Sequence, residues 1–252
     1  MTRSRLAERL VQLAFLGAVL IAWQIATTRG HISALLLPPL TSVYRDFIAL
    51  LSTGQFWPDL GTTLYELVLA FLIAAVSGTV IGYAVSRSGY SVRVFDPLFA
   101  GLYAIPAILL FPLYVLFFGI GPASKIAMGA TIAFFPVVLN TIAGLANVKH
   151  LYVIAARSMG ASPRQMFWSV MLPAASPVLL TGLRMGLILA FLSILGSETI
   201  ASFAGLGHRI VELGENLDTS KMFAYIVFVI VIAFVLNAAV SFAENRGRRQ
   251  LG

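Results

Sequence analysis

The sequence predicts an all-α integral membrane protein with six transmembrane helices. Of its 252 residues, 59% are hydrophobic and only 11% are charged, whereas about a quarter of a soluble domain is charged. The mean hydropathy of +0.92 agrees with this composition. Long uncharged runs separate the few charged residues. Together these features exclude a soluble enzyme and indicate that most of the chain lies in lipid.

Five uncharged runs are each long enough to cross the hydrocarbon core, which takes about 20 residues. They contain 19, 20, 28, 23 and 22 residues. The run of 28 residues is too short for two spans and a turn, so it is expected to be one span. A sixth apolar stretch is interrupted only by Arg184. The predicted spans are residues 10–28, 62–86, 98–118, 125–145, 176–197 and 221–243.

The first span has two interpretations. Arg3, Arg5 and Arg9 followed by Leu10–Ala26 resemble a cleavable signal peptide. However, no small-x-small cleavage site precedes a polar mature domain. We therefore expect this segment to be retained as a transmembrane helix.

Lysine and arginine predict the orientation, because cytoplasmic segments carry an excess of them. With both termini inside, eleven basic residues are cytoplasmic and five are outside. The eleven are Arg3, Arg5, Arg9, Arg87, Arg93, Lys149, Arg157, Arg164, Arg246, Arg248 and Arg249. The five are Arg29, Arg45, Lys125, Arg209 and Lys221. We therefore interpret the net charge of +7 as a signal of membrane topology. The chain is expected to contact lipid and not to bind nucleic acid.

The expected organisation has three parts. Residues 1–60 hold the first span and an outer surface segment, in which Thr41–Leu51 has helical spacing. Residues 61–245 form the core, with a cytoplasmic loop at 146–173. Residues 246–252 are a basic cytoplasmic tail.

Several predicted spans contain residues typical of helices that pack against protein. Pro106, Pro112 and Pro136 free backbone groups that only protein or water can satisfy at membrane depth. Two small-xxx-small patterns, Gly78-x-x-x-Gly82 and Gly182-x-x-x-Gly186, allow helix backbones to approach closely. These helices are therefore expected to face other helices or a pathway.

The stretch Leu151–Pro173 predicts two short helices joined by a turn. Gly160 fits the position that ends the first helix. Ser162, Pro163 and Gln165 fit the N-cap, first and third positions of the second, a capping-box pattern. The second helix would place Met166, Phe167, Val170 and Met171 on one face, and Pro173 would begin a new segment. Two short amphipathic helices between spans indicate a cytoplasmic docking site.

The chain carries no evident catalytic chemistry. It contains no cysteine, and its three histidines lie on different loops without metal-ligand spacing. The nearest match to a nucleotide-binding loop, Gly119–Lys125, lacks the second glycine and the Ser or Thr after the lysine. We therefore expect no catalytic, cofactor or metal site, and an energy source in a partner.

A few polar residues stand at depths suited to a pathway or a gate. Arg184 has two interpretations. Its side chain either contacts an anion in a pathway or extends to place its charge at the cytoplasmic end of the span. Glu198 also has two interpretations. It either lines the outer mouth of the pathway or pairs with a basic residue. The candidates are Asn140, Arg184, Ser193, Ser197 and Glu198.

The docking stretch resembles the EAA loop of ABC-importer permease subunits. Ala155-Ala156, Gly160, Val170 and Leu172-Pro173 match its spacing, while Ile154 stands where the family usually has glutamate. Further segments resemble the nitrate, sulfonate and taurine branch. They are Leu37-Pro38-Pro39, Ala104-Ile105-Pro106, Phe118-Gly119-Ile120-Gly121, Leu139-Asn140-Thr141, Thr181-Gly182-Leu183-Arg184 and Gly205-Leu206-Gly207.

This resemblance implies a type I ABC importer permease in a bacterial plasma (inner) membrane, moving a small, anionic solute. It further implies cytoplasmic ABC ATPase subunits that bind ATP and Mg²⁺, a periplasmic or surface substrate-binding protein, and a second permease copy. The coupling residues it implies are Tyr152, Ala155, Ala156, Arg157, Met159, Gly160, Ala161 and Ser162.

Two other functions compete with this one. A secondary transporter driven by an ion gradient would need ionisable residues at mid-membrane depth, and the sequence offers only Arg184. A non-transporting scaffold would not need prolines in its central spans.

Overall fold

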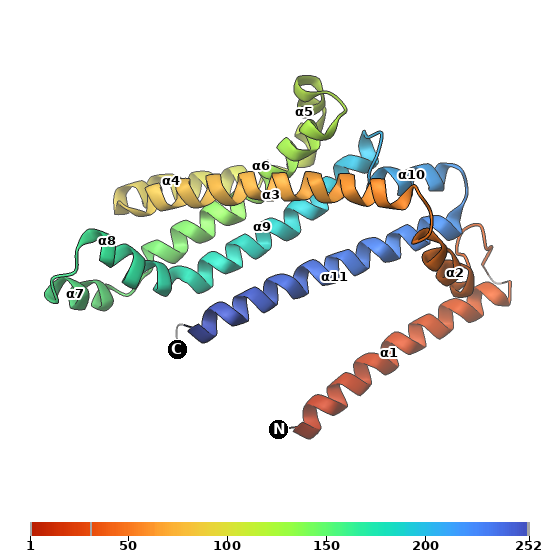
Figure 1. The fold of residues 1–252 in the computed structure, drawn as a ribbon, viewed down its shortest axis with the longest axis horizontal. Coiled ribbons are helices and arrows are strands. Elements are labelled where there is room, and N and C mark those ends of the chain that lie inside the picture. Colours follow the sequence, from red (N-terminus) through yellow and green to blue (C-terminus); the bar gives the residue numbers. More distant parts are fainter. Residues whose placement is uncertain (1, 31, 251–252) are drawn as a thin grey trace. The chain divides into compact units, whose positions relative to one another are not determined.

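The computed structural model describes residues 2–30 and 32–250, and every regular element in those ranges is a helix. In chain order these are α1 (Thr2–Thr28), α2 (Leu40–Leu50), α3 (Phe56–Ser86), α4 (Gly89–Tyr103), η1 (Ala107–Leu110), α5 (Phe111–Phe118), α6 (Pro122–Ala146), α7 (His150–Ser158), α8 (Pro163–Gln165), η2 (Met166–Met171), α9 (Leu172–Ile200), α10 (Leu206–Glu215) and α11 (Thr219–Gln250). Figure 1 labels most of them. His31 lies outside the described residues.

The chain forms two compact units. One, the small unit, comprises Met1–Asp59 and Arg209–Ile230. The other, the core unit, comprises Leu60–His208 and Val231–Gly252. The core unit holds both the predicted docking stretch and all the predicted pathway residues.

The small unit contains the helix predicted over Thr41–Leu51, observed as α2. The side chain of Gln24 on α1 accepts a hydrogen bond of 2.8 Å from the backbone N–H of Leu40 at the start of α2. Farther along α2, the ring of Phe47 stacks on Phe228 with 4.0 Å between centroids. The helix predicted for this segment is confirmed.

The described residues contain five single helical segments long and apolar enough to cross a membrane. These are Leu10–Thr28, Phe56–Ser86, Pro122–Ala146, Pro163–Ile200 and Thr219–Phe242. They correspond to five of the six predicted spans. The sixth exists only if a bent pair, α4 with the η1–α5 segment, counts as one span.

The span predicted over residues 98–118 contains a sharp bend. The α4 helix ends at Tyr103 and the chain bends by 75° before continuing through η1 into α5; Figure 1 shows α5 turned away from α4. Pro106 lies at this break. It lacks an N–H, and its ring disfavours helical geometry in the residue before it. By contrast, Pro136 is accommodated inside α6.

The core is built around α6, which α3 approaches through the first small-residue pattern. A Cβ at Gly78 would lie 2.8 Å from Val137 Cγ1. A Cβ at Gly82 would lie 2.6 Å from Thr141 Cβ. Such distances leave no room for a side chain, so the glycines allow the two backbones to meet.

The second pattern brings α9 against α6 in the same way (Figure 1). A Cβ at Gly182 would lie 2.5 Å from Asn140 Cβ and 3.0 Å from the carbonyl oxygen of Pro136. A Cβ at Gly186 would lie 2.8 Å from Val137 Cγ2. Both small-xxx-small predictions are therefore confirmed, and Val137 contacts both glycine faces.

Replacing Gly182 by alanine is expected to lower the stability of the protein by about 1–3 kcal/mol, because the added methyl group overpacks the α6–α9 contact. Thermal unfolding in detergent measures the effect. Gly101→Ala is the matched control, because Gly101 also lies within a helix but has nothing within 4 Å of an added Cβ. Equal melting temperatures for the two variants would contradict the close-packing interpretation.

Candidate functional site

The predicted docking stretch forms a short exposed helix and a tight turn. The first helix, α7, ends as expected, since Gly160 has a φ of +78° and its N–H donates 2.9 Å to the carbonyl of Arg157. The N–H of Ala161 donates 3.0 Å to the carbonyl of Ala156. These bonds satisfy carbonyls that would otherwise be left unpaired at the helix end.

The second helix begins with the predicted capping box. The N–H of Gln165 donates 3.3 Å to Ser162 Oγ, and the N–H of Ser162 donates 2.9 Å to Gln165 Oε1. Pro163 occupies the first turn. The predicted end of the first helix and the predicted start of the second are therefore both confirmed.

A new helix begins next to Pro173, as predicted, but the helical path of the chain is not interrupted there. After the single turn of α8, the chain forms one π-helical turn, η2, and continues directly into α9. Pro173 falls in the first turn of α9, where its missing N–H costs little. The second docking helix is thus the beginning of a membrane span, and it places Met166 in the core while Trp168 is exposed.

Almost every predicted coupling residue is accessible. Within α7 no residue is buried, and Met159 is 86% exposed. Ala156 and Ala161 are half-buried. The other predicted coupling residues, Tyr152, Ala155, Arg157, Gly160 and Ser162, are exposed.

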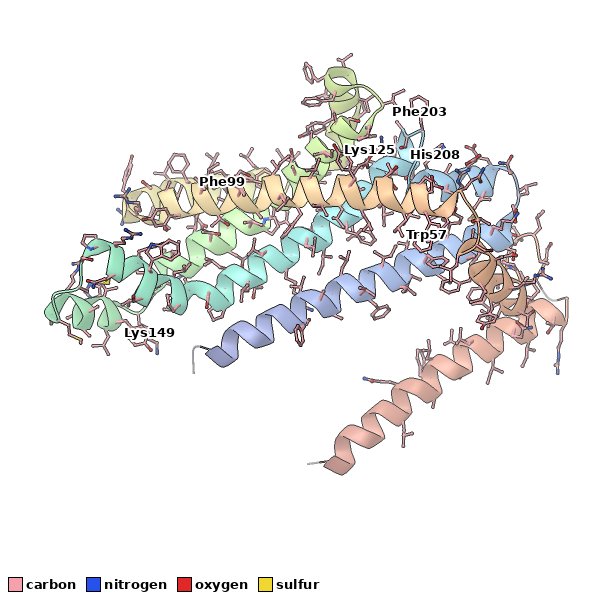
Figure 2. All side chains as sticks on the ribbon, in the orientation of Figure 1. Trp57, Phe99, Lys125, Lys149, Phe203 and His208 are labelled. Carbon is pink, nitrogen blue, oxygen red and sulfur yellow. The ribbon has the colours of Figure 1, made fainter. Side chains whose placement is uncertain are left out.

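An aromatic contact fixes the turn to the rest of the core unit. The ring of Phe167 meets Tyr83, near the end of α3, edge to face with 4.8 Å between centroids. Figure 2 places Lys149, which precedes α7, at the opposite end of the core unit from Lys125 and Phe203. The docking turn therefore terminates one end of the helical core.

The predicted pathway residues do not form one site. Arg184 Nη2 donates 2.5 Å to Asn237 Oδ1 on α11, and Asn140 donates 2.8 Å to the carbonyl of Pro136 within its own helix. Glu198 lies 14 residues beyond Arg184 on α9, about 21 Å at 1.5 Å per residue. Ser197 bonds to the carbonyl of Ile194, while Ser193 Oγ is buried and has no partner among the described residues.

The Glu198 carboxylate holds the loop that follows α9 through hydrogen bonds. Its carboxylate accepts hydrogen bonds of 2.7 Å from Thr63 Oγ1 and 2.7 Å from the N–H of Gly207. Thr63 Oγ1 in turn accepts 2.9 Å from the N–H of Leu206. Gly205, with a φ of +107°, lets the loop pass directly over the carboxylate, where a Cβ would collide with it. Glu198 thus joins α3, α9 and the loop.

Sequence reasoning missed two ionisable residues beside Glu198. Glu66 on α3 and Lys125 in the first turn of α6 are both almost completely buried, and they interact electrostatically with each other and with Glu198. In the sequence, Lys125 counts among the five outer basic residues, and Glu66 falls near the start of the span predicted over residues 62–86. The spacing of Lys125, three residues after a helix-starting proline, was the available signal. We refer to Glu66, Lys125 and Glu198 as the charge cluster.

A separate ion pair stabilises the small unit. Arg209 Nε lies 2.9 Å from Asp59 Oδ2, and Arg209 Nη1 lies 2.6 Å from Glu212 Oε2. Partial burial alone would lower the pKa of Arg209, but the hydrogen bond and charge of Asp59, reinforced by Glu212, raise it above its ordinary value. This arginine therefore stays charged.

The described residues contain no group of three His, Cys, Asp or Glu side chains placed to hold a metal ion. The segment Gly119–Lys125 comprises the turn between α5 and α6 and the first turn of α6, and the lysine ammonium donates to the carbonyls of Ile120 and Gly121.

Residues 70–249 match the family described as binding-protein-dependent transport system inner membrane component. The chain belongs to this family. It is the membrane permease component of an ABC importer, as the resemblance predicted.

Two relatives match this permease over most of its length. It is 33% identical over 236 residues to the taurine transport system permease protein TauC of Escherichia coli (strain K12), covering 92% of this chain and 86% of that protein. It is 32% identical over 232 residues to the putative aliphatic sulfonates transport permease protein SsuC of Bacillus subtilis (strain 168), covering 92% and 84%.

A solved structure is similar in fold. A chain of the MetNI methionine ABC transporter, in an inward-facing conformation, gives a TM-score of 0.57 at 22% identity, covering 81% of the permease and 96% of that chain. At this identity the likeness concerns the fold alone. It confirms the predicted permease fold, while the orientation of the termini stays a prediction.

Replacing Glu198 by glutamine is expected to destabilise the permease by about 1–3 kcal/mol, because the amide cannot accept from both Thr63 and the Gly207 N–H without losing a buried bond. Thermal unfolding measures this. Glu212→Gln is the control, because the Glu212 side chain is 40% exposed and its pair with Arg209 contributes little. The interpretation fails if both variants unfold at the temperature of the unsubstituted protein.

Proposed function

We propose that this permease moves a small sulfonate or related anion across a bacterial plasma (inner) membrane by alternating access. A separate cytoplasmic ATPase binds ATP and Mg²⁺, docks on α7 and drives the change between inward-open and outward-open states. A periplasmic or surface binding protein delivers the substrate. A second copy of the chain completes the pathway, and lipid surrounds both.

The exposed turn at α7 and α8 is the observation that carries the proposal. A nine-residue helix with no buried residue cannot be stable through its own packing, since isolated helices this short are marginal in water. Its caps and the Phe167–Tyr83 contact hold it in place, while its side chains remain available. This is the arrangement expected of a rigid surface that a partner binds.

The charge distribution supports a cytoplasmic location for this turn and for both termini. One of the five basic residues assigned outside, Lys125, is buried in the core unit. Removing it leaves four outer basic residues against eleven inside. The asymmetry in the loops, which is what determines orientation, is therefore larger than the sequence count suggested. We retain the division into residues 1–60, 61–245 and 246–252.

The substrate class rests on the relatives. The taurine and aliphatic sulfonate permeases share a sulfonate group in the substrates that their names state. A sulfonate is a small anion with strong hydrogen-bond acceptors, which agrees with the class expected from the resemblance. Of the predicted pathway residues Asn140, Arg184, Ser193, Ser197 and Glu198, Ser193 is the best candidate for lining, because its hydroxyl has no partner among the described residues.

The alternatives are weaker. The charge cluster supplies the buried ionisable residues that a secondary transporter would need, and which the sequence alone did not reveal. The family, however, consists of components that work with a binding protein, and an ion-driven carrier needs none. A non-transporting scaffold conflicts with the same description.

Gly160→Val is expected to reduce substrate-stimulated ATP hydrolysis at least tenfold in the purified permease–ATPase complex. A β-branched residue is strained at a φ of +78°, so the end of α7 must refold. Deleting Tyr152–Met159 should abolish the stimulation. The readout is the ratio of stimulated to basal hydrolysis.

Gly30→Val controls for backbone strain as such, because Gly30 has a φ of +73° and nothing within 4 Å of an added Cβ, yet lies in the small unit. It should leave the ratio nearly unchanged. Undiminished coupling in the deletion variant would refute docking at α7.

The substrate class has its own test. The binding protein encoded beside this chain is expected to bind taurine or another small sulfonate with a Kd of about 10 μM or lower in calorimetric titration. Binding of cationic ligands alone would overturn the substrate class and leave the docking proposal intact.

A further inference from the structure

One face of α7 is apolar and exposed. Along this helix and its C-cap, Leu151, Ile154 and Met159 are 70%, 48% and 86% exposed. With Ala155 and Ser158, which are also exposed, they recur at the i, i+3, i+4, i+7 and i+8 spacing of a single helix face. We refer to these five residues as the apolar stripe. A surface helix usually turns its apolar face to the core, so α7 is oriented the opposite way.

The side of α7 that meets the core unit lies opposite the apolar stripe. Val153 and Ala156 are half-buried, whereas the other residues of His150–Ser158 are exposed. At about 100° per residue, the midpoint between these two falls about 170° around the helix from Leu151. Figure 1 shows α7 at the tip of the core unit, beyond the end of α4. The apolar stripe therefore points away from the core unit.

This orientation decides what can cover the stripe. The α7 helix lies between the end of one span, α6, and the start of the next, Pro163–Ile200. It thus lies where the chain leaves the bilayer, and a face directed away from the spans is directed at water. Apolar side chains gathered on such a surface mark a site that another protein binds. The capped end of α7 keeps the stripe in one geometry, which reduces the entropy lost on binding.

The surroundings of the stripe are basic and contain no acidic residue. From Pro97 to Ser197 the sequence has neither aspartate nor glutamate. Arg157 on α7 and Arg164 on α8 are exposed, and neither forms an ion pair with any described residue. The ammonium of Lys149 lies 5.9 Å from the centre of the Tyr152 ring. This surface offers a partner apolar contact and positive charge, but no carboxylate.

We propose that the ATPase partner of this permease receives α7 in an apolar groove with an acidic rim, and that Ile154 selects such a partner. The proposal rests on the proposed function, in which α7 is the docking element. Ile154 stands where the family usually has glutamate, and no other residue of the docking stretch can supply that carboxylate. A carboxylate buried in an apolar groove is strongly unfavourable. The groove that fits Ile154 therefore discriminates against glutamate at the same position.

A series of substitutions at residue 154 tests the groove. The Kd between the purified permease and the ABC ATPase encoded beside this chain is measured by calorimetric titration. Ile154→Leu should stay within about threefold of the unsubstituted Kd, because the buried apolar area is kept. Ile154→Gln should raise the Kd about tenfold, because that area is lost. Ile154→Glu, with a side chain of the same size as glutamine, should raise it at least a hundredfold, because the charge must be buried.

The melting temperatures of the free variants provide the folding control, and all three should match the unsubstituted permease because residue 154 is exposed. A Kd for Ile154→Glu equal to or below that of the unsubstituted chain would overturn the apolar groove, since the partner would then present a cation there. Equal values for the glutamine and glutamate variants would overturn the burial of residue 154.

Deleting Tyr152–Met159 separates this inference from docking itself. If the deletion variant binds the ATPase as tightly as the unsubstituted permease, docking at α7 fails and the proposed function fails with it. If the deletion abolishes binding while Ile154→Glu leaves the Kd unchanged, docking stands and only the apolar groove is refuted.

Salt dependence tests the acidic rim. Raising NaCl from about 0.05 M to about 0.5 M should raise the Kd of the unsubstituted permease at least fivefold, because screening weakens charge pairs at an exposed rim. Arg157→Gln should raise the Kd at low salt and reduce this dependence. Arg45→Gln is the matched control, because Arg45 is also exposed but lies on α2 of the small unit; it should change neither value. A Kd independent of salt would overturn the acidic rim.

A fluorescent label distinguishes the ATPase from lipid as the cover of the stripe. The chain contains no cysteine, so Met159→Cys creates a single site for an environment-sensitive dye. In nanodiscs of phosphatidylethanolamine and phosphatidylglycerol, the emission should stay that of the dye in water until the ATPase is added, and then shift to shorter wavelength. Val76→Cys, 64% exposed on α3, should report lipid with or without the ATPase. A short-wavelength signal from residue 159 before the ATPase is added, or no shift afterwards, would overturn the proposal.

Discussion

Close packing of backbones along α6 is the constraint on which the core unit depends. In a bilayer the hydrophobic effect does not drive helices together, so association relies on contact between surfaces that fit. Glycines from α3 and from α9 both pack against the side chain of Val137, and neither contributes a side chain of its own to the contact. Asn140 fits only because Gly182 opposes it. The positions of Arg184, Ser193 and Glu198 along α9 follow from this one helix contact.

The sequence predicted those features that depend on local chemistry. The capping box at Ser162 and the left-handed glycine at position 160 are set by neighbouring backbone groups, so residue types alone reveal them. The small-residue patterns gave the right contact faces. The proline positions were less informative, because Pro106 breaks its helix whereas Pro136 does not. The difference goes with packing: α6 packs against both α3 and α9, while the α4–α5 segment is largely exposed.

The charge cluster could not be predicted, because burial is a property of the assembled helices. Glu66, Lys125 and Glu198 are far apart in sequence, and each stands near the end of an uncharged run, where a charge normally meets water or headgroups. In the structure, the ends of α3, α6 and α9 meet beneath the loop that Glu198 clasps, and this excludes solvent. A rule that ends each span at its first charged residue therefore misplaces these residues. The same rule overestimated the outer positive charge by counting Lys125.

The second helix of the docking stretch and Glu198 lie on one continuous helical segment, Pro163–Ile200. From Pro163 to Ile200 the chain is helical without a break longer than the π-helical turn of η2, and α9 alone spans about 43 Å at 1.5 Å per residue. A π-helical turn adds a residue to the helix without interrupting its backbone bonding, so it changes which side chains face the core while the helix remains stiff. Glycine contacts with α6 restrain α9 along its side. A displacement that a docked ATPase imposes at α8 would then reach Glu198 and the loop that follows α9 by movement of a single helix. In the proposed cycle, the two ends of the core unit need no other mechanical connection.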